Sequence, residues 1–333
     1  MILVTGGAGY IGSHCVLSLL KKGEKVVVFD NLYTGHIEII KKLSKYGDLE
    51  FIQGDLRNKN DIEKVFEAFN IDAVIHFAAL ALVGESMAEP QKYYLNNVLG
   101  SINLLDTMIK NNVKKIVFSS TAATYGEPQY SPIDEIHPQN PINPYGQSKL
   151  MVEKIMDDYD RAYGLKSIRL RYFNVAGANP EAIIGEWHDI ETHLVPNILK
   201  STFNSIRVFE IFGDDYQTKD GTCVRDYVNI EDLIDAHLLA LEYLNNGGKT
   251  NFFNLGTKDG STVKEVFQAS EKICGQAIPV KISARRAGDP SCLVADNSKA
   301  RSILGWEPKR TLEDSIKSAY NWEKVLQSLE IKC

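Results

Sequence analysis

The chain has 333 residues, of which 44% are hydrophobic and 24% are charged, and its formal net charge is −6. This composition is ordinary for a globular protein and supplies enough apolar residues for a sizeable core in one large domain or two smaller ones. The mildly acidic charge and the lack of a basic tract argue against nucleic acid and anionic membrane surfaces as partners.

Targeting and membrane signals are not evident in the sequence. No apolar run approaches the roughly 20 residues of a transmembrane helix. The N-terminus begins directly as a strand, without the charged flank and cleavage site of a signal peptide. The five cysteines are odd in number, widely scattered and form no CxxC pair. We therefore expect reduced thiols, a cytoplasmic location and no membrane association.

Short apolar runs alternate with amphipathic stretches over the first half of the chain. We expect buried strands, and helices between them. The strands are expected at residues 2–4, 26–29, 51–52, 73–77, 116–119 and 168–172, and the helices at 11–22, 61–69, 96–110 and 147–163. Such strand–helix alternation predicts an α/β fold with a doubly wound parallel sheet.

The periodicity weakens after about residue 175. Residues 177–187 lack a clear period and are expected to form a loop, whereas later helices are expected at 231–244, 263–273 and 312–326. No internal repeat or long linker separates independent domains. We expect a nucleotide-binding domain and a smaller, partly interleaved C-terminal substrate lobe. Their expected bounds are 1–174 with a return segment at about 225–250, and 175–224 with 251–333.

A glycine-rich segment follows the first expected strand. Gly6, Gly9 and Gly12 lie where this strand passes into the first helix. Glycine there permits a tight turn and close approach of the backbone to a pyrophosphate. The start of the helix adds free N–H groups and a partial positive charge. The segment therefore favours a Rossmann-type dinucleotide-binding sheet.

An acidic residue in the right place distinguishes the two common dinucleotides. Asp30 follows Gly12 by 18 residues at the end of the second expected strand, and no Arg or Lys comes directly after it, only Asn31 and Leu32. A carboxylate there accepts hydrogen bonds from ribose hydroxyls and repels a 2′-phosphate, so NAD is favoured over NADP. Asp55, after the third strand, could reach the adenine amino group. His76 is more simply a core histidine whose hydrogen bonds are satisfied.

Three side chains form a candidate catalytic group. Tyr145 and Lys149 are four residues apart, on one face of an expected helix. A tyrosine with an ordinary pKa of about 10 is a poor base at neutral pH, but a lysine ammonium beside it and a positive nicotinamide ring favour the phenolate. Thr121, at the end of the fifth strand, can hydrogen-bond the reacting substrate oxygen and hold it near Tyr145.

Motifs of one family run nearly from end to end. They are TGGAGYIGSH (5–14), DNL (30–32), GDLRN (54–58), VIHFAA (74–79), VGES (83–86), YYLNNVLG (93–100), FSSTAATYGE (118–127), NPYGQSKLMVE (143–153), RYFNVAGA (171–178), IFGDDY (211–216), DGTCVRDYV (220–228), FNLG (253–256), RRAGDP (285–290) and LGWEPK (304–309). On these motifs the chain resembles the extended short-chain dehydrogenase/reductases, and among them the UDP-glucose 4-epimerases.

The resemblance implies a reaction and a set of contacts. Tyr145 would remove the O4 proton while a hydride passes from sugar C4 to tightly bound NAD, and the 4-keto sugar would turn over and take the hydride back on its other face. The implied cofactor contacts are Gly6, Gly9, Tyr10, Ile11, Gly12, Asp30, Asn31, Leu32, Gly35, Asp55, Leu56, Phe77, Ala78, Ala79, Asn96, Ser119, Tyr145, Lys149, Tyr172 and Phe173. The implied UDP-sugar contacts are Thr121, Tyr145, Asn174, His193, Leu194, Phe212, Arg225, Tyr227, Arg286 and Asp289.

The resemblance also implies a homodimer, in which the helices at 96–110 and 147–163 would pair with their copies. One position departs from the family pattern, and a second leaves the substrate range of this chain open. Ala81 stands where many members carry a lysine that helps to hold the cofactor. Leu293, of intermediate size, stands where residue size tunes acceptance of N-acetylated sugars.

Other functions known on the same fold agree less well with this sequence. The 4,6-dehydratases need an acid and a base directly after the Ser/Thr, where this chain has Ala122 and Ala123. An NADP reductase conflicts with Asp30, and a dinucleotide-sensing regulatory relative would often lack the Tyr–Lys pair. Epimerases of UDP-pentoses or UDP-uronic acids remain open. No metal site is expected, because Trp187-His188 and His193 match no zinc-ligand spacing; they are expected in a loop that closes over substrate.

Overall fold

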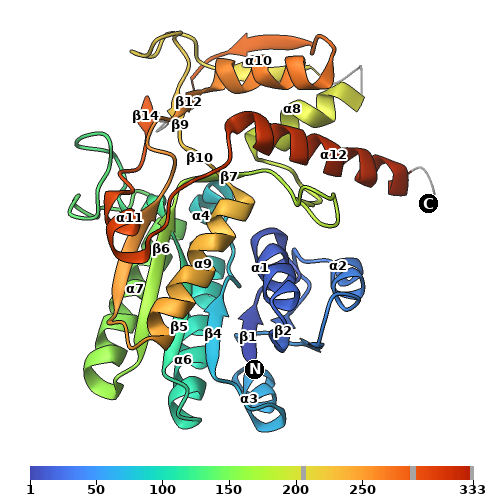
Figure 1. The fold of residues 1–333 in the computed structure, drawn as a ribbon. Coiled ribbons are helices and arrows are strands. Elements are labelled where there is room, and N and C mark those ends of the chain that lie inside the picture. The colour runs from blue at the N-terminus through green and yellow to red at the C-terminus, as the bar shows by residue number, and fades with distance from the viewer. Residues whose placement is uncertain (204–207, 286–289, 331–333) are drawn as a thin grey trace.

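The computed structural model describes residues 1–203, 208–285 and 290–330. A seven-stranded parallel sheet in the order β11-β6-β5-β4-β1-β2-β3 forms the centre of the molecule (Figure 1). The six strands expected in the first half are confirmed, and a seventh joins them from far along the chain. Their bounds are β1 Ile2–Thr5, β2 Val26–Asp30, β3 Leu49–Gln53, β4 Ala73–His76, β5 Lys115–Thr121, β6 Lys166–Tyr172 and β11 Asn251–Leu255.

Helices cover both faces of this sheet. One apolar core unites α1, α2 and α9 with the sheet, and a second unites α3, α6 and α7 with its other face. The expected helices are confirmed to within a few residues, and α2 is an addition. The bounds are α1 Tyr10–Lys21, α2 Ile37–Leu43, α3 Lys59–Ala68, α6 Gly100–Lys110, α7 Pro144–Tyr163 and α9 Ile230–Asn245. Burial on both sides explains why β1, β2 and β4 read as continuous apolar runs.

The strand order reverses direction between β1 and β4, where β1 pairs with β2 on one side and β4 on the other. In open parallel sheets, ligands bind in the crevice beyond the carboxyl ends of the strands at such a reversal. A binding site is therefore expected at the loops that follow β1, β2, β4 and β5.

The helix expected at 96–110 is built in two parts. A π-helical segment, η1 Tyr94–Leu99, precedes α6, and two short helices, α4 Val83–Ala88 and α5 Pro90–Tyr93, lead into it. In η1 the buried Asn97 accepts a hydrogen bond from Leu80 N (2.9 Å) and donates to Leu80 O (3.0 Å) and Ser148 Oγ (3.0 Å). Asn97 thus positions the loop after β4. The apolar periodicity of the sequence could not indicate this role for a polar residue.

A smaller C-terminal lobe packs over the carboxyl ends of the sheet (Figure 1). It has its own apolar core, centred on α8, α10 and α12. The helices are α8 Leu194–Phe203, α10 Val263–Cys274, α11 Ser298–Leu304 and α12 Leu312–Glu330. The short strands are β7 Asn174–Ala176, β8 Phe209–Phe212, β9 Val224–Arg225, β10 Tyr227–Asn229, β12 Ser261–Thr262, β13 Val280–Ser283 and β14 Cys292–Leu293.

The two regions interleave along the chain. The sheet includes β11 at Asn251–Leu255, in register with Ile168–Tyr172 of β6, so the sheet-forming part of the chain extends beyond the return segment expected to end at about residue 250. The stretch expected to be aperiodic, 177–187, is a loop. Among the described residues, no helix is both long and apolar enough to cross a membrane.

Candidate functional site

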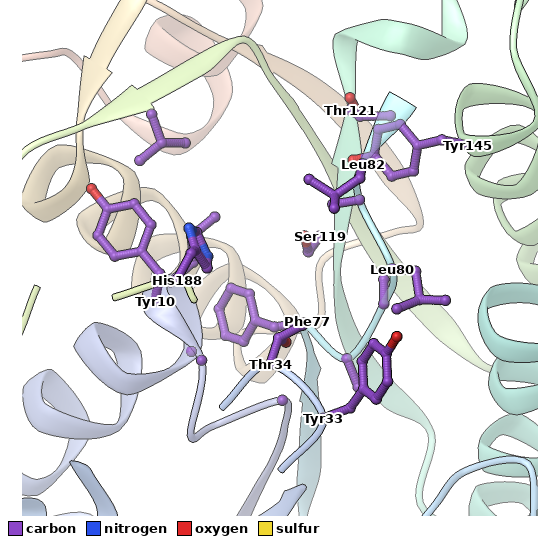
Figure 2. A pocket seen from close by; sticks show the side chains of 18 of the residues that line it. Tyr10, Tyr33, Thr34, Phe77, Leu80, Leu82, Ser119, Thr121, Tyr145 and His188 are labelled. Atoms are coloured by element: carbon purple, nitrogen blue, oxygen red, sulfur yellow. The ribbon is translucent and has the colours of Figure 1, made fainter. Parts of the chain in front are cut away.

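A cavity of about 660 Å³ opens above the carboxyl ends of the central strands. It brings together most of the predicted site residues (Figure 2). In Figure 2, Tyr145 and Thr121 lie on one side of the cavity, and Tyr10 and His188 lie on the other. The predicted residues that line it are Gly6, Gly9, Tyr10, Ile11, Gly12, Asp30, Asn31, Asp55, Leu56, Phe77, Ala78, Ala79, Asn96, Ser119, Thr121, Tyr145, Lys149, Tyr172, Phe173, Asn174, His193, Leu194 and Tyr227.

The glycine turn is a tightly packed cradle. Gly6 has a left-handed φ of +74°, and a Cβ there would lie 2.6 Å from Ala78 N. A Cβ on Gly12 would lie 2.1 Å from Gly6 O, whereas one on Gly9 would meet only Gly6 O at 3.5 Å and would project into open space. Gly9 is also the N-cap of α1 and supplies no side-chain cap. The first turn of α1 is therefore open to an anionic group.

We expect Gly12→Ala to disrupt this turn, because the new methyl group cannot fit beside Gly6 O. Overpacking of this kind costs about 1–3 kcal/mol, and displacement of the turn should weaken dinucleotide binding at least 10-fold. Urea unfolding and NAD titration by calorimetry measure both effects. The control is Gly84→Ala in α4, where a Cβ meets nothing within 4 Å. Wild-type stability and affinity in Gly12→Ala would contradict the assigned packing.

Asp30 is a buried carboxylate at the end of β2. Its Oδ2 accepts a hydrogen bond from Ala8 N (3.0 Å), and its Oδ1 accepts one from Leu32 N (2.8 Å). Burial raises the pKa of Asp30, and these two backbone hydrogen bonds oppose the rise. Each oxygen keeps lone-pair capacity toward the cavity, as binding of ribose hydroxyls requires.

Asp55 is engaged within the protein. It accepts hydrogen bonds from Asn31 Nδ2 (3.0 Å) and from Arg57 Nε (2.9 Å) and Nη2 (2.6 Å). The hydrogen bonds from Arg57 lower the pKa of Asp55 to about 2. His76 is a core histidine, as expected, with Nδ1 2.6 Å from Thr5 Oγ1 and Nε2 2.9 Å from Ser101 Oγ.

The start of α7 places Tyr145, the candidate base. Asn143 caps the helix by accepting a hydrogen bond from Gly146 N (2.8 Å), and Pro144 occupies the first turn, where a missing N–H costs nothing. A Cβ on Gly146 would lie 2.4 Å from Ala123 O, so this glycine lets α7 approach the end of β5 closely. The side chain of Tyr145 consequently hydrogen-bonds that of Thr121. Burial raises the pKa of Tyr145, and the hydrogen bond with Thr121 opposes the rise.

Lys149 lies one turn further along α7 and is 3% exposed. Its Nζ donates a hydrogen bond to Ser119 O (2.8 Å) and lies 4.8 Å from the centre of the Phe118 ring. Burial lowers the pKa of Lys149 to about 7, against an opposing effect of the Glu153 carboxylate. A buried amine with this pKa can change its proton content near neutral pH, which suits a group that assists proton transfer.

This pKa makes stability depend on pH. Between pH 7 and the ordinary lysine pKa of about 10.4, the unfolded chain holds a proton at residue 149 that the folded chain lacks, so stability rises with pH across this interval. From pH 7 to pH 9 the free energy of unfolding of the wild type should rise by about 2 kcal/mol relative to that of Lys149→Met, as measured by urea unfolding of both proteins. A pH-independent difference would show that the amine titrates normally.

A buried ion pair between Glu153 and Arg171 joins α7 to β6. Glu153, four residues after Lys149, accepts hydrogen bonds from Ser120 Oγ (2.5 Å) and from Arg171 Nε (2.9 Å). The side chains of Glu153 and Arg171 are each 3% exposed. Arg171 also donates to Tyr125 Oη (3.0 Å). Sequence reasoning did not select this pair, although a charged residue inside an otherwise buried strand is the signal that could have revealed it.

Four predicted site residues do not line the cavity. Leu32 and Gly35 are in the loop after β2, next in sequence to residues that do line it (Asn31, Tyr33 and Thr34). Arg225 is buried in β9, where its Nη1 donates to Val224 O (2.8 Å) and Pro290 O (2.9 Å), and Phe212 ends β8, beside Ser283 of β13. Arg286 and Asp289 fall outside the described residues.

Other residues line the cavity without having been selected from the sequence. They include Tyr33 and Thr34 after β2, Leu80 and Leu82 after β4, and Ile190. The loop after β4 is placed by long-range hydrogen bonds to Asn97, which local sequence could not indicate. Ala81, where the family often has lysine, also lines the cavity.

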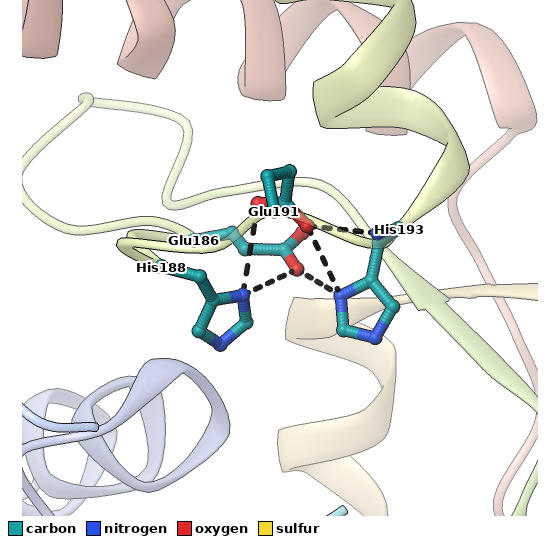
Figure 3. Close-up of side chains that lie close together, drawn as sticks. All are labelled: Glu186, His188, Glu191 and His193. Atoms are coloured by element: carbon teal, nitrogen blue, oxygen red, sulfur yellow. Dashed lines mark hydrogen bonds and ion pairs between the residues drawn. The ribbon is translucent and has the colours of Figure 1, made fainter. Parts of the chain in front are cut away.

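A loop segment between β7 and α8 forms part of the wall. His188 and His193 line the cavity, and both imidazoles lie against the carboxylates of Glu186 and Glu191 (Figure 3). Burial would lower the pKa of His188, but its hydrogen bonds to the two carboxylates raise that pKa to about 10. The charge of Glu186 raises the pKa of His193. The spacing of these four residues along the chain did not indicate that their side chains would meet.

Comparison with known proteins places this arrangement in a family. Residues 3–319 match the model of the family described as GDP-mannose 4,6 dehydratase. A UDP-glucose 4-epimerase from Lactobacillus helveticus is 53% identical over 324 residues, which cover 97% of each chain. The chain belongs to the UDP-glucose 4-epimerase family.

Solved structures of epimerases agree in fold over nearly the whole chain. A crystal structure of a UDP-glucose 4-epimerase matches with a TM-score of 0.95 and 47% identity, covering 98% of each chain. The structure of the Bifidobacterium longum UDP-glucose 4-epimerase in complex with NAD+ and UDP matches with a TM-score of 0.91 and 40% identity, covering 97% of this chain and 98% of that one. The epimerase family, rather than dehydratase chemistry, fits the alanines that follow Thr121.

Proposed function

We propose that the chain is an NAD-dependent UDP-glucose 4-epimerase, which interconverts UDP-glucose and UDP-galactose. The observation that carries this proposal is that Tyr145, Lys149 and Thr121 line the same cavity as the glycine turn and Asp30. The relatives named above act as epimerases, and the Bifidobacterium longum structure holds NAD+ and UDP. Epimerases of UDP-pentoses or UDP-uronic acids are a less favoured alternative.

The residues present fit NAD. Gly9 leaves open space at the start of α1 for a pyrophosphate, and Asp30 faces the cavity where the adenosine ribose would lie. Among the described residues that line the cavity, no arginine and one lysine, Lys149, are found. A 2′-phosphate would therefore meet Asp30 without a counter-charge, which favours NAD over NADP.

The chain's own residues would divide the chemistry as follows. Thr121 would hold the sugar O4 beside Tyr145, and the Tyr145 phenolate would take the O4 proton and later return it. NAD held in the cavity would supply reversible hydride transfer at sugar C4. Lys149 would stabilise the phenolate through its charge. The buried walls would exclude water from the keto sugar.

The nucleotide end of the substrate would be held by the C-terminal lobe. Asn174, Tyr227, Leu194 and His193 line the cavity and are candidates for contacts with UDP. Phe212, Arg225, Arg286 and Asp289 remain candidates on the family resemblance. This assignment corresponds to a cofactor domain at 1–174 with 225–250, to which β11 at Asn251–Leu255 adds a strand, and a substrate lobe at 175–224 with the rest of 251–333.

Assembly and location are also part of the proposal. Leu95 and Leu99 of η1 and Met151 of α7 are exposed apolar side chains on the helices expected to pair in a homodimer, and burial of apolar surface would stabilise such a pair. The described cysteines Cys15, Cys274 and Cys292 are free thiols, which fits a reducing cytoplasm.

The direct test is to incubate the purified protein with UDP-galactose, without added cofactor, and to resolve the products by ion-pair chromatography. Formation of UDP-glucose supports 4-epimerisation and co-purification of NAD. No conversion, even with NAD supplied, would overturn the assignment, and UDP-xylose and UDP-glucuronic acid would then be tried. A parallel reaction with UDP-N-acetylgalactosamine tests what Leu293 permits.

A further inference from the structure

The loop segment that forms part of the cavity wall concentrates four metal-ligating side chains. Glu186, His188, Glu191 and His193 each present one ligand atom, and all four atoms lie within 4.8 Å of one another. Figure 3 shows the two imidazoles turned inward on either side of the carboxylates. The residues come from one short stretch of chain, so their convergence reflects the conformation of this loop.

Three of the distances between donor atoms are close to those of a tetrahedral site, whereas His193 Nδ1 and Glu186 Oε1 are in hydrogen-bond contact and would have to separate on metal binding. His188 Nδ1 lies 3.2 Å from Glu186 Oε1 and 3.6 Å from Glu191 Oε2. His193 Nδ1 lies 3.7 Å from Glu191 Oε1 and contacts Glu186 Oε1. A zinc ion with ligands at about 2.0–2.2 Å in a tetrahedron separates neighbouring ligand atoms by roughly 3.4 Å. Small adjustments of the side chains would bring all four donors onto one ion.

Burial and charge also favour a cation here. The side chains of Glu186 and Glu191 are 5% and 4% exposed. Across residues 1–203, 208–285 and 290–330, no lysine or arginine is found within ion-pair distance of either carboxylate. The two carboxylates pair with the imidazoles of His188 and His193, whose pKa values they raise. A divalent cation would displace the imidazole protons and itself neutralise both carboxylates. Two imidazole nitrogens with two carboxylate oxygens suit zinc better than calcium or magnesium, which prefer oxygen ligands alone.

We propose that Glu186, His188, Glu191 and His193 bind one zinc ion that fixes the loop along the wall of the cavity. Four protein ligands close the coordination sphere, so the ion has a structural role and no open position for substrate. This proposal replaces the sequence-based expectation of no metal site, and it does not depend on the proposed epimerase activity.

The surroundings of the cluster show what the ion would hold in place. Trp187, between two of the ligands, stacks on His36 with ring centres 3.9 Å apart and an interplanar angle of 8°. Trp322 Nε1 of α12 donates to Glu186 O (2.8 Å). The loop therefore lies between the cofactor domain and α12, and a zinc ion would lock His188 and His193 at the cavity surface.

The experiment uses the full chain without a histidine tag. The protein is stripped with EDTA, dialysed against zinc, and its metal content is measured by mass spectrometry; cobalt is then substituted and its visible spectrum recorded. We expect about one zinc per chain and the intense absorption of tetrahedral cobalt. Glu186→Gln and His188→Asn should each weaken zinc binding at least ~100-fold in a competition titration with a chromophoric chelator.

The matched control is Glu181→Gln, an exposed carboxylate of the same loop, which should bind zinc like the wild type. Thermal unfolding of the wild type should shift upward in zinc, and that shift should disappear in His188→Asn. Substoichiometric binding, binding unchanged in both ligand variants, or an octahedral cobalt spectrum would each overturn the proposal, and the four side chains would then form an ion-pair network alone. None of these measurements depends on epimerase turnover.

Discussion

Replacement of Tyr145 by phenylalanine should reduce turnover of UDP-galactose by about 10²–10⁴-fold, the usual contribution of a positioned general base. The variant keeps the ring that packs beside Thr121 but loses the phenolic oxygen that would exchange the O4 proton. Binding of NAD and UDP should stay within about threefold of the wild type, because neither ligand needs that oxygen for affinity. Coupled assays of kcat and calorimetric titrations measure the two quantities separately.

The control for this variant is Tyr163→Phe. Tyr163 ends the same helix, α7, but is exposed and does not line the cavity. Its loss of a hydroxyl should leave both kcat and affinity unchanged. If Tyr145→Phe kept more than a tenth of wild-type turnover, another group would have to be the base, and the proposed role of Tyr145 would be wrong.

Replacement of Glu153 by glutamine should destabilise the folded protein by about 3–5 kcal/mol, the usual cost of removing one partner of a buried ion pair. The change is nearly isosteric, so the loss would come from leaving Arg171 without its carboxylate rather than from altered packing. Urea unfolding followed by circular dichroism measures it. Glu153 also opposes the lowering of the Lys149 pKa, so the variant should lower that pKa further.

Asp158→Asn provides the matched control on the same helix. Asp158 pairs with Arg161 at the surface, where both side chains are largely exposed, and exposed pairs contribute at most about 1 kcal/mol. The double variant Glu153→Leu/Arg171→Met should recover much of the lost stability, because it removes both buried charges. A small effect of Glu153→Gln would mean that Arg171 finds another counter-charge or water.

The order of strands and helices follows from local patterns. Continuous apolar runs predicted six buried strands, and 3.6-residue periodicity predicted the major helices. The sequence also indicated the main site residues, because each lies at a short, fixed distance in sequence from a predicted strand or helix. These are the glycine turn, Asp30, Tyr145 and Lys149. The turn must directly follow β1, Asp30 must end β2, and Tyr145 and Lys149 must share one face of α7.

Contacts between distant parts of the chain could not be read in this way. β11 pairs with β6 although the two strands are about 80 residues apart in sequence. Asn97 positions the loop after β4 by hydrogen bonds to Leu80, 17 residues earlier. The buried Glu153–Arg171 pair joins α7 to β6, and neither residue looks unusual in its own segment except by its charge. Position in sequence likewise could not show that Arg225 donates to backbone carbonyls outside the cavity wall.

The sequence by itself determined the fold class, the preference for a dinucleotide and the identity of the candidate catalytic group, because these rest on local propensity and fixed spacing. Only the tertiary structure decided which residues share one cavity and which side chains meet in the loop at 186–193. That loop has no helical or strand period to predict its path. Its four ligand-type side chains converge because backbone contacts with His36 and Trp322 hold it against both the cofactor domain and α12.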